Sequence, residues 1–127
     1  MSAVLLDTHV FVWGQLAPNR LTAGAKNAIE KADAVWVSAI TFFEIAQKAR
    51  LGKWPEVAAV VDSLPGLHET QGGRIAPLDA DICVSAGSLP WPHRDPFDRL
   101  IAATALRRRI SLVSADAAFD DVLQRVW

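Results

Sequence analysis

The 127-residue sequence contains one cysteine, Cys83, and lacks the patterns of a secreted or membrane protein. A lone cysteine cannot form an internal disulfide, and its apolar neighbours Ile82 and Val84 predict a small buried thiol. No apolar run reaches about 18 residues. Asp7 and His9 interrupt the apolar start, which also lacks a basic leader. We therefore expect a cytoplasmic protein that does not enter a membrane.

The sequence also lacks an excess of positive charge, since its formal net charge is −1. Taken alone, this charge argues against a nucleic acid partner. However, two bound Mg²⁺ ions would add four positive charges and bring the total from −1 to +3. Net charge therefore does not exclude RNA or DNA as a substrate.

The length and the apolar content of 51% are typical of a single globular domain, which we expect to span residues 1–127. Short apolar runs alternate with helical patterns, and this order predicts an α/β sandwich with a mostly parallel sheet. Strands are predicted at residues 4–6, 34–37 and 110–113, with a short apolar piece at 75–78. Helices are predicted at residues 9–16, 23–32, 41–51, 55–64, about ten residues from 79, 97–109 and a short C-terminal segment.

Four acids, Asp7, Glu44, Asp98 and Asp116, stand where a predicted strand has ended and a helix is beginning. In a parallel sheet these junctions meet along one edge. Carboxylates gathered there repel each other unless a divalent cation holds them. Hard oxygen ligands, without paired histidines or cysteines, favour Mg²⁺ or Mn²⁺ over zinc. The pattern predicts a metal-dependent nuclease, because such a site can activate water for phosphodiester hydrolysis.

Two of these acids also have a structural interpretation, since Asp, Ser and Thr cap helices in any protein. Asp7 or Thr8 can cap the first helix. Thr41 and Glu44 match a capping box, and Glu44 with Lys48 forms a favourable i, i+4 pair. Both interpretations fit the sequence.

Asp98 is harder to explain as a cap, because it shares a helical stripe with Ile101, Ala102 and Ala105. The stripe turns a carboxylate toward the packed side of the helix, where an unpaired charge costs several kcal/mol. Asp95 is better placed as the cap, because a proline follows it at the first helical position. We expect Asp95 to lie beside the metal ligands.

The residues around the last two acids offer further candidates. Ser114 can cap the last helix and leave Asp116 free to face the sheet edge. His93 can contact RNA or assist proton transfer, although we favour a turn-stabilising role because no partner nucleophile or base is visible. Arg94 and Arg99 can bind phosphate, and Arg99 can instead pair with the Asp95 cap one turn back.

The tryptophans and an arginine run carry weaker expectations. Trp36 is expected in the core, and Trp54 and Trp91 as exposed anchors for a partner. Residues 107–109, all arginine, are expected as a solvated helix end that meets the helix dipole favourably.

Four stretches match a known family in its own order: residues 4–9 (VLLDTH), residues 38–46 (SAITFFEIA) with Lys48, residues 51–53 (LGK), and Leu89-Pro90 followed by residues 93–99 (HRDPFDR). Over essentially its whole length the sequence resembles PIN domains, and more narrowly the VapC-type ribonuclease toxins of bacterial toxin–antitoxin pairs. The family's last motif, usually Thr-x-Asp after a strand, is Ser114-Ala115-Asp116 here and keeps a hydroxyl.

The resemblance implies a three-layer α/β/α fold and an Mg²⁺-dependent endoribonuclease, with Mn²⁺ as a substitute, that acts on cellular RNA such as tRNA or rRNA. It implies an acidic quartet in which Asp7 and Asp98 hold the principal metal, with Glu44 and Asp116 completing the set. Activated water would attack phosphorus in line and leave a 5′-phosphate and a 3′-hydroxyl. The resemblance also implies a homodimer inhibited by a small antitoxin that covers the groove. The alternative is an inactive PIN-like RNA-binding or assembly module, against which the complete quartet argues.

Overall fold

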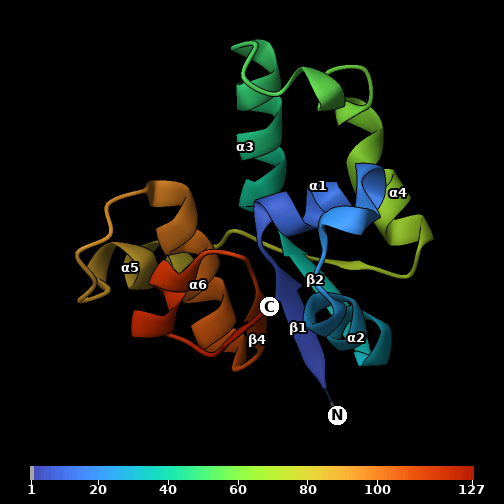
Figure 1. Ribbon diagram of the computed structural model, residues 1–127. Coiled ribbons are helices and arrows are strands. Elements are labelled where there is room, and N and C mark those ends of the chain that lie inside the picture. Colours follow the sequence, from blue (N-terminus) through green and yellow to red (C-terminus); the bar gives the residue numbers. More distant parts are fainter. Residues whose placement is uncertain (1) are drawn as a thin grey trace.

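The computed structural model describes residues 2–127, so Met1, the first residue of the expected domain, lies outside the described residues. A five-stranded sheet in the order β3-β2-β1-β4-β5 forms the centre, and every strand pair is parallel (Figure 1). The strands are β1 (Ala3–Leu6), β2 (Ala34–Ser38), β3 (Arg74–Ala76), β4 (Ser111–Val113) and β5 (Arg125–Val126). The predicted parallel α/β sheet is confirmed.

Helices cover both faces of this sheet. They are α1 (Thr8–Leu16), α2 (Ala23–Lys31), α3 (Ala39–Arg50), α4 (Leu64–Thr70), α5 (Ala80–Ser88) and α6 (Pro96–Arg108). The layer formed by α5 and α6 lies on one side of the sheet, and α1, α2 and α4 lie on the other, while α3 extends beyond the end of β2 (Figure 1). This arrangement is the three-layer α/β/α sandwich that the sequence resemblance implied. Within residues 2–127, no helix combines the length and apolar character needed to cross a membrane.

The central strand β1 is buried on both faces, which explains its unbroken apolar run. Leu5 packs with Ile101 and Leu112 in the cluster on the α6 side. Val4 and Leu6 point the other way and pack in the cluster formed with α1. Because β1 is fixed from both sides, the residue that follows it is held in a rigid setting.

The predicted helix at 55–64 is wrong. The segment forms two 3₁₀ turns, Pro55–Val57 and Val61–Ser63, and α4 begins at Leu64. Pro65, expected to end a helix, lies in the first turn of α4, where a proline is tolerated because the N–H it lacks has no partner there. The predicted C-terminal helix is likewise only a 3₁₀ turn, Ala117–Asp121, and the short strand β5 follows it. A two-residue strand carries no periodicity that would predict it.

Two single-residue predictions also differ from the structure. Cys83 is exposed, because α5 turns Ile82 inward and leaves the thiol outside. Trp91, expected as an exposed anchor, is 6% exposed and lies 5.5 Å from the ring of Phe119. The arginines at residues 107–109 are exposed, as expected, and the guanidinium carbon of Arg108 also lies 4.0 Å from the ring centroid of the half-buried Trp36.

Candidate active site

Asp7 lies directly after the central strand, and only 8% of it is exposed. The register aligns Leu6 with Val113, so the residues following β1 and β4 meet at the carboxyl edge of the sheet. There the Ser114 hydroxyl donates to Oδ2 of Asp7 at 2.7 Å, and the Thr8 backbone N–H donates to Oδ1 at 2.8 Å. Asp7 therefore caps α1, as one interpretation proposed, and is also held from the neighbouring strand.

The pKa of Asp7 is raised above its ordinary value, chiefly because burial disfavours the charged form of the carboxylate. The hydrogen bonds from Ser114 and Thr8 and the positive charge of His9 oppose this rise. The charge of Glu44 adds to it. Asp7 is thus a buried acid whose ionised form lacks a full set of compensating charges.

Glu44 lies on α3 and is 5% exposed. Its Oε2 accepts a hydrogen bond from Nζ of Lys48 at 2.7 Å, which confirms the expected i, i+4 pair. Since the charge of Glu44 raises the pKa of Asp7, these two carboxylates are close enough to repel each other. The apolar positions of this helix recur at Phe42, Ile45, Ala46 and Ala49 and leave Glu44 out, so the sequence pattern does not predict its burial.

The capping box predicted for Glu44 is wrong. Ser38 caps α3 instead, and its hydroxyl accepts from the N–H of Ile40 at 3.2 Å. The hydroxyl of Thr41 lies 3.0 Å from that of Thr8 in a buried contact between α3 and α1. Because Ser38, three residues before Thr41, caps the helix, the carboxylate of Glu44 is not part of a capping box and is available to the site.

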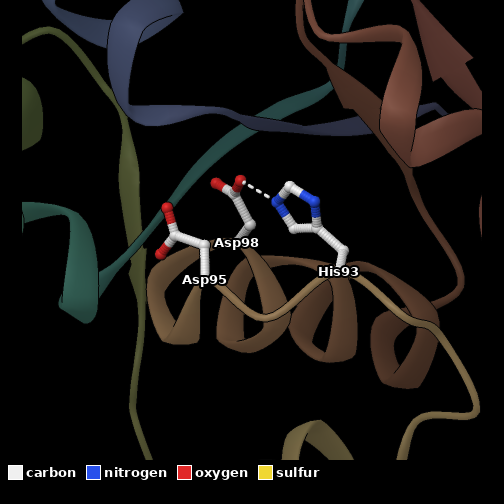
Figure 2. A group of neighbouring side chains, drawn as sticks. All are labelled: His93, Asp95 and Asp98. Carbon is white, nitrogen blue, oxygen red and sulfur yellow. Dashed lines mark hydrogen bonds and ion pairs between the residues drawn. The ribbon is translucent and has the colours of Figure 1, made fainter.

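Asp98 lies in the first turn of α6, and its Oδ2 makes a 2.7 Å hydrogen bond with Nε2 of His93 (Figure 2). Its pKa is raised to about 6, chiefly by burial, and the charges of Asp7 and Asp95 add to the rise. The His93 ring also stacks on Trp91 with a centroid separation of 4.6 Å. The apolar stripe behind Asp98 is buried as predicted, at Ile101, Ala102 and Ala105.

Asp95 is the N-cap of α6, as predicted, and its Oδ1 accepts from the N–H of Phe97 at 2.9 Å. Figure 2 shows its carboxylate beside that of Asp98 at the start of the helix. Among residues 2–127, His93, Asp95 and Asp98 form the one group of three potential ligands whose donor atoms lie within 4.8 Å of one another. The other three acids of the quartet are not in this group.

Asp116 differs most from its expected setting. It is exposed, and its Oδ1 accepts from the N–H of Ala118 at 2.9 Å, which caps the 3₁₀ turn. Ser114, expected as this cap, donates to Asp7 and accepts from the N–H of Asp116 at 3.0 Å. Because the hydroxyl is engaged by Asp7, the capping role passes to Asp116. The Ser114 hydroxyl links the backbone N–H of Asp116 to Asp7, and we call the exposed position of Asp116, outside the buried acids, the rim of the site.

Arg99 organises the proline-rich loop before α6. All five of its N–H groups have carbonyl acceptors, so the suggested pair with Asp95 is absent and no N–H remains for phosphate. Four of these acceptors lie at 2.6–2.9 Å and one at 3.5 Å; they are the carbonyls of Ala86, Leu89, Trp91, His93 and Gly87. The guanidinium of Arg99 therefore fixes the conformation of the loop that carries His93. Arg94 is exposed, and its side chain makes no hydrogen bond or ion pair within the described part of the chain.

His9 and two tryptophans at the same edge were not predicted as site residues. The ring centroid of the exposed His9 lies 4.8 Å from that of Trp54 and 5.7 Å from that of Trp13. The i, i+4 spacing of His9 and Trp13 is the sequence signal that places both on one face of α1. No sequence signal brings Trp54 to this face, because it comes from the loop after α3.

A cleft of about 620 Å³ lies elsewhere, between α1, α2 and the loop at residues 71–73. None of the four acids lines it. The candidate site is therefore defined by the chemistry of its acids and not by the size of a cavity.

The acids suit a hard divalent cation. Glu44 and Asp98 each have one oxygen held by a side chain, and their other oxygens make no hydrogen bond within residues 2–127. These oxygens and the buried Asp7 provide anionic donors from three elements of the fold. Such a donor set fits Mg²⁺ or Mn²⁺.

A family model of the PIN domain matches residues 4–123. The chain is 38% identical over 118 residues to Ribonuclease VapC22 of Mycobacterium tuberculosis, with 91% of this chain and 88% of that protein covered. Two solved structures share the fold. VapBC2 from Rickettsia felis, bound to a DNA fragment from their promoter, gives a TM-score of 0.67 at 21% identity and 97% and 96% coverage. A toxin–antitoxin complex from Klebsiella pneumoniae gives 0.56 at 20% identity and 89% and 86% coverage. The chain therefore belongs to the PIN-domain family and, within it, to the VapC type.

Proposed function

We propose that this chain is an Mg²⁺-dependent endoribonuclease, with Mn²⁺ as a substitute, and the toxin of a toxin–antitoxin pair. The observation that carries the proposal is the burial of Asp7 near two further carboxylates, Glu44 and Asp98, with which it interacts electrostatically. A buried cluster of like charges is unfavourable unless a cation binds there. The name of VapC22, a ribonuclease 38% identical to this chain, supports the reaction type.

Asp7 and Asp98 would hold the principal ion, and Glu44 and Asp116 would complete the acidic quartet. When bound, Mg²⁺ activates water and stabilises the leaving oxygen in phosphodiester hydrolysis. Asp116 would act from the rim, since its carboxylate is exposed and caps the following turn.

The neighbouring residues would fix the acids before substrate arrives. Ser114 and the Thr8 N–H orient Asp7, and His93 orients Asp98. Hydrogen-bonding partners of metal ligands keep those ligands in place and tune their affinity. Arg94, which is exposed in the loop that carries His93, is the candidate for contact with a substrate phosphate.

The proposal extends to the setting of the reaction. Residues 1–127 would act as one PIN-like nuclease domain in the cytoplasm, with cellular RNA as the substrate. The chain would form a homodimer and be inhibited by a small antitoxin. The fold shared with a toxin–antitoxin complex from Klebsiella pneumoniae supports such a partner.

The proposal is tested by incubating the purified chain with RNA and mapping the new RNA ends. We expect 5′-phosphate and 3′-hydroxyl ends in Mg²⁺ or Mn²⁺, no cleavage in EDTA, and none by Asp7→Asn. Asp81→Asn is the matched control, because Asp81 is a 81% exposed side chain on α5. Cleavage that continues in chelator would exclude the metal mechanism, and no cleavage with either metal would favour an inactive RNA-binding module.

A further inference from the structure

We propose that an aromatic and cationic surface beside the acidic site binds single-stranded RNA by base stacking. The inference rests on the proposed ribonuclease function and specifies the conformation of the RNA that reaches the acids. We call this surface the aromatic track; it consists of His9, Trp13, Trp54, Trp127, Arg20 and Lys48.

The track is a continuous series of ring contacts. Trp54 lies 4.8 Å from His9, His9 lies 5.7 Å from Trp13, and Trp13 lies 5.9 Å from Trp127, measured between ring centroids. His9 and Trp13 are one turn apart on α1, whereas Trp54 follows α3 and Trp127 follows β5. Three distant segments of the chain thus build one surface.

The track begins at the acidic site. His9 is two residues beyond Asp7, in the first turn of the helix that Asp7 caps. Lys48 belongs to both regions, because its Nζ donates to Glu44 at 2.7 Å and lies 5.6 Å from the ring centroid of Trp54. A nucleotide held on Trp54 or His9 would therefore lie next to the acids.

The charges and exposure of the track suit a polyanion with flat bases. His9 is exposed, and Trp13, Trp54 and Trp127 are half-buried. Trp54 and Trp127 pack against the core on one side and keep part of their surface exposed to solvent. The guanidinium carbon of Arg20, also exposed, lies 4.5 Å from the ring centroid of Trp13. Proteins that bind single strands combine such rings, on which bases stack, with cations that neutralise phosphates. Cations here would also offset the repulsion between RNA and the acids.

The same geometry favours a single strand over a duplex. In a duplex the bases are already stacked on each other, and the deep major groove of A-form RNA does not admit side chains. Unpaired loop nucleotides can instead be splayed out and stacked on aromatic rings. The track therefore predicts that unpaired segments are the RNA regions delivered to the acids.

Trp36 and Arg108 provide a matched control. They also pair a tryptophan with an arginine, at 4.0 Å, but on the sheet face covered by α6. Arg108 ends α6, just before β4 begins, whereas the acids follow the strands. Trp36→Leu and Arg108→Ala therefore remove the same groups away from the track.

Binding is measured by fluorescence anisotropy with a labelled oligoribonucleotide that cannot pair with itself, in Mg²⁺ at fixed ionic strength. The Asp7→Asn protein is used so that the probe stays intact. We expect Trp13→Leu and Trp54→Leu each to raise Kd about tenfold, because leucine keeps apolar volume but loses the stacking face. We expect Trp36→Leu to leave Kd unchanged, and a duplex of the same sequence to compete poorly. Thermal unfolding of each variant separates loss of binding from loss of fold.

The salt dependence tests the cations separately. Arg20→Ala should lower the slope of log Kd against log salt by about 0.7, the value for one phosphate contact on a single strand. Arg108→Ala should leave the slope unchanged. Equal slopes for both variants would show that Arg20 makes no contact with an RNA phosphate.

Three results would overturn the inference: unchanged Kd in both track variants, duplex binding as tight as single-strand binding, or loss only of antitoxin binding, which would make the surface a protein-docking face. Cleavage assays in the unmutated background distinguish this failure from failure of the proposed function. If the chain cleaves RNA and Trp54→Leu leaves KM unchanged, the track fails while the nuclease stands. If the chain binds RNA through the track but never cleaves it, the track stands and the proposed nuclease function fails.

Discussion

The acidic site and the aromatic track lie side by side, yet each places its residues against their usual preference. Asp7 and Glu44 are 8% and 5% exposed, although carboxylates are rarely buried; Lys48 pairs with Glu44, whereas Asp7 has no ion pair within residues 2–127. Trp13 and Trp54 are only half-buried and lie beside the exposed His9, although tryptophans are highly buried on average. Local conflicts of this kind are expected where function, and not stability, selects the residue.

The two regions differ in what holds them. The acids are fixed by hydrogen bonds from Thr8, Ser114 and His93, which depend on particular atoms at particular distances. The rings of the track are held by broad contacts at 4.8–5.9 Å that tolerate small shifts. Substitution should therefore act almost as an on–off change in the acidic site and in graded steps along the track.

The largest expected effect separates two members of the quartet. Asp98→Asn should lower kcat/KM for RNA cleavage by at least about 10³-fold, roughly 4 kcal/mol, because it removes a half-buried ligand charge. Asp116→Asn should cost only about tenfold, because the exposed carboxylate lies at the rim and asparagine also caps helices. Initial rates with labelled RNA measure both. Equal losses of kcat/KM would show that Asp116 contributes as much to catalysis as Asp98.

The next effect breaks the acidic site without touching the track. Arg99→Met should lower the free energy of unfolding by about 3 kcal/mol, because it leaves the loop carbonyls without donors. This corresponds to a fall in Tm of roughly 10 °C. Arg94→Met is the matched control and should change Tm little, since Arg94 is exposed. An unchanged Tm in Arg99→Met would show that the loop keeps its shape without the guanidinium.

Elements with strong local signals could be predicted from the sequence. Helices α1, α2, α3 and α6 begin and end within about two residues of the predicted bounds, because their ends are marked by caps and breakers. Asp95 followed by proline caps α6, and Gly52, with φ of +74°, ends α3 as expected. The strand before Asp7 was predicted from three apolar residues, because strands buried on both faces show no alternation.

What could not be predicted depends on which segments meet in space. Ser114 had two possible uses, and the strand pairing that brings it to Asp7 decided between them. Arg99 had one visible partner in sequence, Asp95, but the folded loop offered it several carbonyls. Trp54 joins His9 only because α3 and α1 pack together. Such choices among competing hydrogen bonds and contacts are tertiary, and local patterns do not encode them.

A smaller effect is expected at His93, whose role the sequence left open. His93→Ala should weaken Mn²⁺ or Mg²⁺ affinity about tenfold, because partners of metal ligands contribute at this level. His93→Gln, which keeps an N–H donor, should recover part of the loss. Isothermal titration calorimetry with Mn²⁺ measures both. If His93→Ala lowers Tm but leaves metal affinity intact, its role is to stabilise the turn.

The smallest effect uses pH to compare the acidic site with the rest of the surface. Burial raises the pKa of Asp98 to about 6 and also raises the pKa of Asp7. In the unfolded chain, carboxyl groups titrate near pH 4. Between about pH 4 and 6 the folded, metal-free chain therefore binds more protons than the unfolded chain, so its stability falls as pH rises through this window. In EDTA, the free energy of unfolding should be about 1 kcal/mol larger at pH 5 than at pH 7.5. This difference is reduced because Asp98 still contacts water.

The surface pair Asp120–Arg125 has the opposite sign, since the pKa of Asp120 is lowered by its hydrogen bond to Arg125. The stabilisation from this pair is lost only as pH falls below the usual pKa range of a carboxyl group, so it does not affect the comparison of unfolding at pH 5 and pH 7.5. Mg²⁺ favours the ionised carboxylates, and we expect it to stabilise the chain more at pH 7.5 than at pH 5. Thermal unfolding with and without the ion measures the difference. Asp7→Asn should reduce it, because it removes one of the buried charges that the cation and the protons compete for.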